Sequence, residues 1–303
     1  MKRFNSIVAL LILININAVA QKNGDYYKND GNLDSAMYAY GAAFFQNPSD
    51  TDNAYELSRT LSLMGMVDTA FYFLEAATIN NNSLIPLADP ELYFLSGHPR
   101  WEKFEASQIE KYQSENGPLK NPAYALKLIR LIQKDQAFNY HQNQAFSFYQ
   151  KNGRGPHWLY PILTIKGQNV KSNFKLVVEL IEKNGWPTFD EVGELAADAP
   201  LLIINHMEDQ GIQEKYLPQI KQACLIGQGN CMEYAKIQDE LLLSQGKPQE
   251  YGMQFRMNRE RKREPFPIRD PETVDQRRLA IGLEPLKVYL KRKIDYDFDI
   301  KQK

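Results

Sequence analysis

Residues 31–44 (GNLDSAMYAYGAAF) and 65–78 (GMVDTAFYFLEAAT) repeat one pattern at a spacing of 34 positions. The residues that recur are Gly31 as Gly65, Asp34 as Asp68, Ala36 as Ala70, Tyr38 as Tyr72 and Ala43 as Ala77. Tyr40 and Leu74 are the large apolar residues at equivalent places. Small residues at helical spacing let neighbouring helices approach closely, and large ones fill the grooves between them. The repeat therefore predicts packed helical hairpins over residues 24–82.

This repeat resembles the tetratricopeptide repeat, a helix–turn–helix unit of the same length. The spacing of Ala36, Tyr40, Ala43 and Pro48 matches the small–large–small–Pro order of that family's second helix, and Gly24 matches a small residue of its first. The resemblance implies a surface that binds a protein or peptide partner, although two units could instead serve as a structural support. Each unit needs a neighbour to bury its apolar face, so residues 84–116 or the following domain must supply one.

Residues 1–20 have the three parts of a cleavable secretory signal in the expected order. Lys2 and Arg3 give a positive start, Ile7 to Ile16 form an apolar run, and Ala18-Val19-Ala20 carries the small residues that a signal peptidase accepts. We therefore expect an exported protein, periplasmic or secreted, with no membrane span after cleavage. An uncleaved membrane anchor is the alternative.

Charge is distributed unevenly along the chain. Residues 22–118 carry 6 Lys/Arg against 14 Asp/Glu, whereas residues 119–303 carry 28 against 23. This change of sign suggests two modules. The densest basic stretch, Arg256 to Arg263, is short and is expected to be a solvated or ion-pairing loop, so nucleic acid is not an expected partner.

Cys224 and Cys231 are the two cysteines, and they bracket a Gly-rich turn. In an oxidising compartment this spacing predicts a structural disulfide. A zinc site is a poor alternative because no further Cys or nearby His has ligand spacing, and we expect neither a metal nor another cofactor. The sequence also lacks the nucleophile elbow, the zinc-protease, P-loop and dinucleotide motifs.

The remaining residues are organised by helix signals, and the expected fold class is all-α: short tetratricopeptide-like hairpins packed on an irregular helical domain. Asn121-Pro122 opens a helix, Asn184-Gly185 ends one, and Thr188 with Glu191 forms a capping box. A loop is expected over residues 153–167. The predicted helices are 170–183, 213–223, 232–245 and 271–293, the last divided near Gly282 and Pro285. The predicted division is a signal at 1–20, repeats at 21–83, a connector with one short helix at 84–118, a helical domain at 119–293 and a tail at 294–303.

Residues 120–292 resemble an uncharacterised bacterial family that is labelled only as a domain of unknown function. The motifs that carry the resemblance are Asn184-Gly185-Trp186-Pro187-Thr188, Gly193, His206, Gly246-x-x-Gln249-x-Tyr251-Gly252-x-Gln254, Asp270-Pro271, Arg277-Arg278 and Gly282-Leu283. In that family an Asp-Arg pair and a Thr stand where this chain has Asp239-Glu240 and Met253. The resemblance implies a domain boundary and brings no known chemistry with it.

His206 is the candidate general base. It lies one helical turn from Leu202 and Ile203, so we expect it to face the interior with them. A buried imidazole beside a carboxylate or Tyr can accept a proton during catalysis. A structural histidine with one satisfied hydrogen bond would have the same geometry.

The other candidate site residues form a polar set: Gln249, Tyr251, Gln254, Asp135 and Arg278. The first three follow Gly246-Lys247-Pro248 and are expected on a loop, where polar side chains commonly line binding sites. Two amides and a phenol suit recognition of a small polar ligand. They could instead tie the loop to the ends of neighbouring helices by satisfying backbone groups.

The sequence thus predicts an extracytoplasmic protein-interaction or ligand-binding protein. The alternative is a hydrolase-like enzyme in which His206 is the base and Gln249, Tyr251 and Gln254 position a polar substrate. The two hypotheses differ in whether these four side chains converge.

Overall fold

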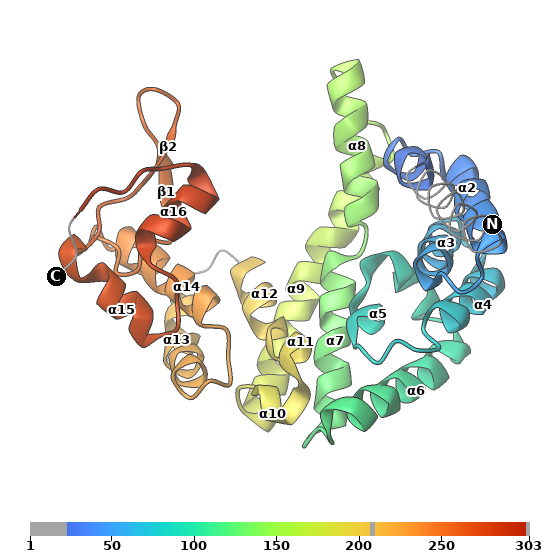
Figure 1. Cartoon of the computed structure of the whole chain (residues 1–303), viewed down its shortest axis with the longest axis horizontal. Helices are drawn as coiled ribbons and strands as arrows, with labels where there is room; N and C mark the ends of the chain where they lie inside the picture. The colour runs from blue at the N-terminus through green and yellow to red at the C-terminus, as the bar shows by residue number, and fades with distance from the viewer. Residues whose placement is uncertain (1–22, 207–209, 301–303) are drawn as a thin grey trace, which may run out of the picture. The chain divides into compact units, whose positions relative to one another are not determined.

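The computed structural model describes residues 23–206 and 210–300 (Figure 1). The predicted signal at residues 1–20 lies outside this part of the chain. The described residues are mostly helical, so the predicted all-α class is confirmed. None of their helices has the length and apolarity that a bilayer crossing requires.

The chain divides into two compact units. Unit 1 comprises Met1–Pro122 and Ile129–Asn173, and unit 2 comprises residues 123–128 and 174–303. Two helices, α7 (Pro122–Gln136) and α9 (Leu159–Asn184), contribute residues to both units. Residues 23–29 of unit 1 are also helical. Its further helices are α2 (Leu33–Gln46), α3 (Thr51–Leu63), α4 (Val67–Ala77), α5 (Ile85–Ala88), the 3-10 helix η1 (Pro90–Leu95), α6 (Pro99–Asn116) and α8 (Asn139–Asn152).

The turns that precede α2 and α4 have the same hydrogen bonds, so the 34-residue period is present in the backbone. Gly31 and Gly65 occupy equivalent places in these turns, with φ of 82° and 73°. A residue in the left-handed region at a helix end favours glycine because glycine has no Cβ to clash. The shared backbone bonds, all between 2.8 and 3.1 Å, are Gly31 to Lys28, Asn32 to Tyr27, Gly65 to Ser62 and Met66 to Leu61.

Side chains of the repeat also occupy equivalent environments. Tyr38 and Tyr72 are both exposed. The buried residues are the small and large ones that define the pattern: Ala36, Tyr40, Ala43, Ala70, Leu74 and Ala77. Gly24 is required in the first unit because a Cβ there would lie 2.4 Å from the ring of Tyr40. The predicted close helix packing is therefore confirmed.

Residues 84–118 are part of the core of unit 1 and not only a connector. The one short helix predicted within this segment is longer than expected, since α6 begins at Pro99 and ends at Asn116. Trp101 is buried with its ring centroid 6.5 Å from that of Phe71 on α4. Arg100 lies over the same Phe71 ring at 4.7 Å. This segment is the neighbour that covers the second repeat unit.

An ion-pair network ties the repeats to η1. Lys28 contacts Glu56 at 2.8 Å and Glu91 at 2.5 Å. Arg59 contacts Asp89 and Glu91 at 3.1 Å each and also pairs with Glu56. All five side chains are less than a quarter exposed, so solvent screens these pairs weakly.

The loop predicted over residues 153–167 is correct for 153–158 and wrong from Leu159 onward. α9 begins at Leu159 and contains both Pro161 and Gly167. Pro161 is tolerated because it falls in the first turn, where no intrahelical acceptor exists for its missing N–H. α8 was not predicted at all, because its sequence NYHQNQAFSFYQKN has little apolar periodicity.

Unit 2 contains short helices and one hairpin. The predicted capping box is confirmed, since Thr188 and Glu191 make both of its bonds. The antiparallel hairpin pairs Arg256 with Glu264 and was not predicted. The elements are α10 (Phe189–Val192), α11 (Glu194–Ala197), α12 (Ala199–His206), α13 (Gln210–Leu225), α14 (Cys231–Ser244), β1 (Phe255–Met257), β2 (Arg263–Pro265), the 3-10 helix η2 (Pro271–Thr273), α15 (Val274–Ala280) and α16 (Leu286–Ile294).

The first turns of α7 belong to the core of unit 2. Tyr124, Ala125 and Leu128 are buried. The hydroxyl of Tyr124 donates to the carbonyl of Gly185 at 3.0 Å. Gly185 begins the Gly-Trp-Pro-Thr motif, so this motif is held by a residue about sixty positions earlier in the chain.

Candidate functional site

The loop of residues 249–254 is anchored by a carboxylate on α14. Asp239 is fully buried and accepts hydrogen bonds from three backbone N–H groups. Glu250 donates at 2.6 Å, Tyr251 at 2.9 Å and Met253 at 2.9 Å. The carboxylate therefore fixes the path of the loop where the chain has no helix or strand of its own.

The two glutamines of the motif also bond to the backbone. Gln249 is fully buried, and its amide nitrogen donates to the carbonyls of Gln254 at 3.2 Å and Phe266 at 2.8 Å. Its amide oxygen accepts the N–H of Gln254 at 2.9 Å. The side chain of Gln254 donates to the carbonyl of Lys236 on α14 at 3.0 Å. Both side chains thus hold the loop on its neighbours.

Arg278 holds the loop from α15. Its guanidinium is buried and donates to the carbonyls of Tyr251 at 2.5 Å and Glu284 at 2.7 Å. The same group contacts the sulfur of Met253 at 3.4 Å and lies 4.8 Å over the ring of Tyr289. Several hydrogen bonds to one buried cation compensate its loss of hydration.

Gly252 meets two separate demands. Its φ of 76° is in the left-handed region, and a Cβ would lie 2.5 Å from the side chain of Leu286. Any larger residue would strain the backbone and overlap α16. The glycine in the order Gln-x-Tyr-Gly-x-Gln is therefore explained by loop geometry.

Electrostatics agree with a structural loop. Burial raises the pKa of Asp239, and the three backbone N–H bonds oppose that effect. Burial also raises the pKa of Tyr251, with a further contribution from its hydrogen bond to Tyr234. A phenol that holds its proton this firmly is a poor general base near neutral pH.

The structure brings together Gln249, Tyr251, Gln254 and Arg278, but not all of the predicted set. Asp135 is buried on α7 in unit 1, where its carboxylate accepts from Gln136 at 2.7 Å. The hydrogen bonds of the two glutamines follow the second interpretation, in which they tie an irregular loop to neighbouring elements.

His206 does not face the interior, so that prediction is wrong. It is the last residue of α12 and is exposed, whereas Ile203 is buried and Leu202 is half-buried. The buried stripe of this helix is displaced from the side that carries Leu202 and His206.

Asp239 is the residue whose role the sequence did not reveal. In the sequence it stands out only as part of the Asp239-Glu240 pair of the family pattern, yet it anchors the loop. One signal was available: Asp239 lies one turn from Ala235 on the side of α14 that is buried. A carboxylate in a buried stripe requires hydrogen-bond partners.

Comparison with known families finds a match for the C-terminal half of the chain. A model described as a family of unknown function (DUF6624) matches residues 149–303, just over half of the chain. The chain belongs to the DUF6624 family. The match includes the whole 249–254 loop and confirms a C-terminal domain of unknown function, and it does not extend to the repeats. No curated protein and no solved structure matches the chain.

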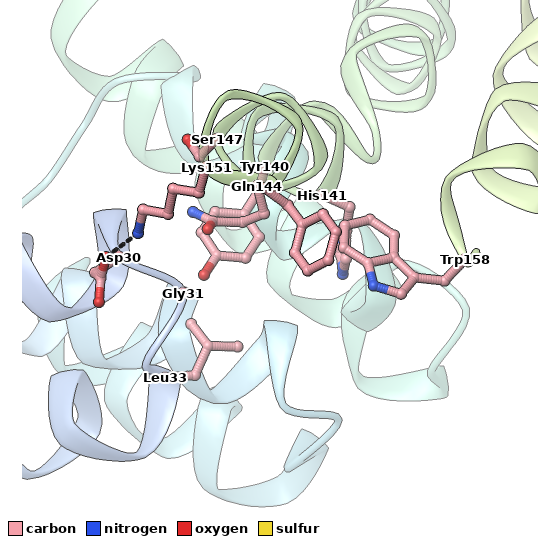
Figure 2. Close-up of a pocket in the computed structure, with 10 residues that line it drawn as sticks. Asp30, Gly31, Leu33, Tyr140, His141, Gln144, Ser147, Lys151 and Trp158 are labelled. Carbon is pink, nitrogen blue, oxygen red and sulfur yellow. Dashed lines mark hydrogen bonds and ion pairs between the residues drawn. The ribbon is translucent and has the colours of Figure 1, made fainter. Parts of the chain in front are cut away.

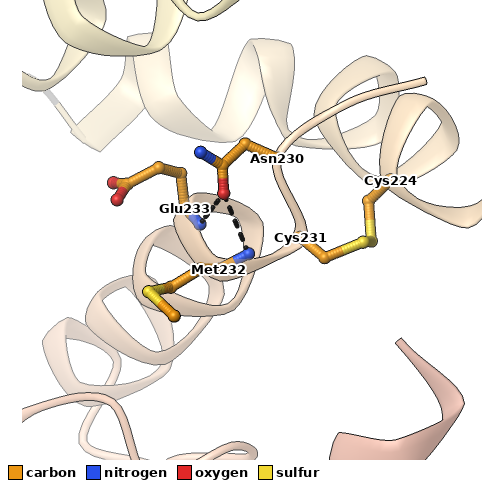
Figure 3. Close-up of a disulfide and its surroundings, with 5 residues drawn as sticks. All are labelled: Cys224, Asn230, Cys231, Met232 and Glu233. Carbon is orange, nitrogen blue, oxygen red and sulfur yellow. Dashed lines mark hydrogen bonds between the residues drawn. A yellow bond between two sulfur atoms is a disulfide. The ribbon is translucent and has the colours of Figure 1, made fainter. Parts of the chain in front are cut away.

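A disulfide lies within the DUF6624 segment, as predicted. Cys224 near the end of α13 is bonded to Cys231, the first residue of α14 (Figure 3). Asn230 caps α14, because its side-chain oxygen accepts from the N–H groups of Met232 at 3.1 Å and Glu233 at 3.2 Å. The bridge and the cap together fix the turn between the two helices.

The Trp-Pro-Thr motif of the DUF6624 segment borders a shallow pocket of about 320 Å³. Trp186 and Thr188 form one side, and Pro218 and Gln222 of α13 belong to the other. The ring of Trp186 packs 5.9 Å from that of Tyr216. This pocket offers two apolar surfaces and no titratable side chain among its lining residues, so it lacks an acid–base pair.

An apolar groove lies on the repeats, outside the DUF6624 match. It has a volume of about 380 Å³ and is formed by α2, α3 and α4. Tyr38 and Phe45 border it with exposed fractions of 73% and 72%. Its other lining residues are Met37, Gly41, Ala42, Leu57, Leu61, Met66, Thr69 and Phe73.

Proposed function

We propose that this chain is an extracytoplasmic binding protein whose tetratricopeptide-like repeats hold a cationic, apolar-anchored peptide segment of a partner protein. The observation that carries the proposal is the apolar groove on α2, α3 and α4. Contiguous exposed apolar surface of this kind is typical of protein-interaction sites. The groove is also large enough to take two or three side chains of an extended or helical segment.

The charge around the groove supports a cationic partner. Residues 23–83 contain two Lys/Arg, Lys28 and Arg59, and both are largely buried in ion pairs. The acidic side chains of this stretch that are exposed are Asp25, Asp30, Asp34, Asp52, Asp68 and Glu75. Asp30 is paired with Lys151, and Asp68 and Glu75 are paired with Arg100, so the remaining three supply the negative charge that can attract a partner. Negative charge on the same repeats as the apolar anchors attracts a positively charged segment.

Two observations support the extracytoplasmic location. Residues 1–20 have the order of a secretory signal. The Cys224–Cys231 disulfide is of the kind that persists in an oxidising compartment.

The test measures peptide binding by fluorescence anisotropy. The probe is a labelled peptide of alternating Lys and Leu/Phe, and its comparison is the same peptide with Glu in place of Lys. We expect the cationic peptide to bind and its affinity to fall with salt. Removing both aromatic anchors with Tyr38→Ser and Phe45→Ser should weaken binding by roughly tenfold or more.

The matched control is Tyr160→Ser, because Tyr160 is also 73% exposed in unit 1 and lies outside the groove. It should leave the affinity unchanged. Equal binding of the two peptides, or equal loss in the control, would show that the groove is not the binding site.

A further inference from the structure

A second cavity of unit 1 lies beside α8 and is walled by rings (Figure 2). Its volume is about 360 Å³, within the range of small-molecule pockets. His141 and Phe148, seven residues apart on α8, line it together with Tyr140 and Leu33. Figure 2 shows the indole of Trp158 reaching toward these side chains from the start of α9. Most of the lining surface is therefore apolar.

Most polar groups at this cavity already have partners. The hydroxyl of Tyr140 donates to the carbonyl of Lys28 at 3.0 Å. The side-chain amide of Gln144 donates to the carbonyl of Asn29 at 3.1 Å. Lys151 is paired with Asp30 at 2.9 Å, and both are well exposed at the rim. The cavity therefore presents no uncompensated charge to a ligand.

The exceptions are the hydroxyl of Ser147, which has no hydrogen bond within the described residues, and the side chain of His141. Burial lowers the pKa of its imidazole, so the ring is neutral near pH 7 and has one donor and one acceptor nitrogen. Nδ1 is buried without a hydrogen-bond partner among the described residues. An orphaned acceptor is less costly there than an orphaned N–H, which places the proton on Nε2. Nε2–H is then a donor that a ligand in the cavity can use.

The backbone at this place is also constrained. Phe138, three residues before His141, has φ of 68° and ψ of 5°, which is rare for a bulky residue. Its ring centroid lies 6.0 Å from that of His141 and 5.8 Å from that of Phe94. Residues in such strained conformations persist only where the surrounding packing holds them, and they are concentrated at binding and active sites.

We propose that this cavity binds an uncharged aromatic ring that carries one oxygen, as in a phenol, with the oxygen accepting a hydrogen bond from His141. The ring would pack among Phe148, Trp158 and Tyr140. A saccharide fits less well, because it would bury several hydroxyls against a lining that is mostly apolar. A charged ligand would find no counter-ion that is not already paired. The phenol could be a free small molecule or the side chain of a Tyr in a peptide.

The experiment is isothermal titration calorimetry of the full mature chain with p-cresol, toluene, N-acetylglucosamine and the capped tripeptide Gly-Tyr-Gly. We expect p-cresol to bind more tightly than toluene. His141→Phe keeps a flat ring and removes the donor, so it should abolish the difference between p-cresol and toluene, a loss of roughly tenfold for p-cresol. Phe148→Ala should weaken both ligands.

The control is Phe146→Ala, since Phe146 is 61% exposed on the same helix and does not line the cavity. Circular dichroism checks that each variant is folded. Tighter binding of the tripeptide than of p-cresol would assign the site to a peptide Tyr, and weaker binding would assign it to a free phenol. No binding of either phenol, preference for the saccharide, or an unchanged p-cresol affinity in folded His141→Phe would overturn the proposal.

Discussion

Asp239 and Arg278 bind the backbone N–H and the backbone carbonyl of the same residue, Tyr251. Asp239 accepts the N–H of Tyr251 at 2.9 Å, and Arg278 donates to the carbonyl of Tyr251 at 2.5 Å. The two charged side chains come from α14 and α15, and both are buried. The loop between them therefore joins the two helices through its own peptide groups.

This relationship predicts a large and coupled loss of stability. Asp239→Ala leaves three buried N–H groups without an acceptor, and Arg278→Ala leaves two carbonyls without a donor. Each should lower the free energy of unfolding by about 3 kcal/mol, measured by urea denaturation. The double variant should lose less than the sum, because both changes release the same loop.

Glu240→Ala is the matched control, since Glu240 is the exposed neighbour of Asp239 on α14. It should change stability by about 0.5 kcal/mol or less. A loss in this variant as large as that in Asp239→Ala would contradict the anchoring role.

Two helical glycines should respond to alanine with opposite signs. Gly24→Ala places a Cβ 2.4 Å from the Tyr40 ring and should destabilise the fold by about 1–3 kcal/mol. At Gly41, inside α2, the nearest atom to a Cβ is 4.0 Å away. Gly41→Ala should therefore stabilise by about 0.5–1 kcal/mol through helix propensity. Thermal denaturation of both variants checks the pair, and equal signs would show that the Gly24 packing is wrong.

The disulfide should contribute a modest, redox-dependent part of the stability. Cys224 and Cys231 enclose a short loop, so reduction should lower the free energy of unfolding by about 2–3 kcal/mol. Denaturation with and without dithiothreitol measures this difference. The variant with both cysteines replaced by Ser should be insensitive to the reductant, and an equal shift in that variant would exclude the bridge as its cause.

The ion pairs of Glu56 predict acid sensitivity of the repeats. Burial is the largest single effect and raises its pKa, but Lys28 and Arg59 together outweigh it, so the pKa lies below the ordinary 4.5. A depressed carboxyl pKa stabilises the folded state above the unfolded pKa, and this contribution is lost as pH falls through the folded value. The free energy of unfolding should therefore decrease as the pH falls below about 4.5.

Glu56→Gln should lower stability at pH 7 by roughly 2 kcal/mol and flatten that decrease. Glu110→Gln is the control, because Glu110 is exposed on α6 in the same unit. A pH profile of the Glu56 variant that matches the wild type would place the sensitivity elsewhere.

Local signals in the sequence predicted the elements that are determined locally. The Asn121-Pro122 start, the Thr188–Glu191 box and the glycines of the repeat each act within a few residues, and each prediction is confirmed. α8 carries no such signal. It is held instead by hydrogen bonds to residues 28–30, which are more than a hundred positions earlier in the chain. Strands of three residues are too short for an alternating pattern to be recognised.

The candidate sites depend more than the helices do on residues that are distant in the sequence. The loop motif was found, but its meaning required Asp239 and Arg278, which lie ten or more positions away on other elements. The cavity beside α8 combines residues 30–33 with residues 140–158, a pairing that no spacing rule predicts. The prediction that His206 is buried was wrong because helical periodicity gives the relative angles of side chains but does not say which side of the helix is buried.

The bond between Tyr124 and Gly185 bears on where the DUF6624 domain begins as a folding unit. The matched stretch starts at residue 149, yet Tyr124, Ala125 and Leu128 are buried in the core of unit 2, and Tyr124 bonds to its Gly-Trp-Pro-Thr motif. A fragment cut at residue 149 would leave that part of the core open to water and would expose a cavity the size of a Tyr and a Leu. The sequence that defines membership of the family thus begins after residues 123–128 of α7, which belong to the same compact unit as its Gly-Trp-Pro-Thr motif.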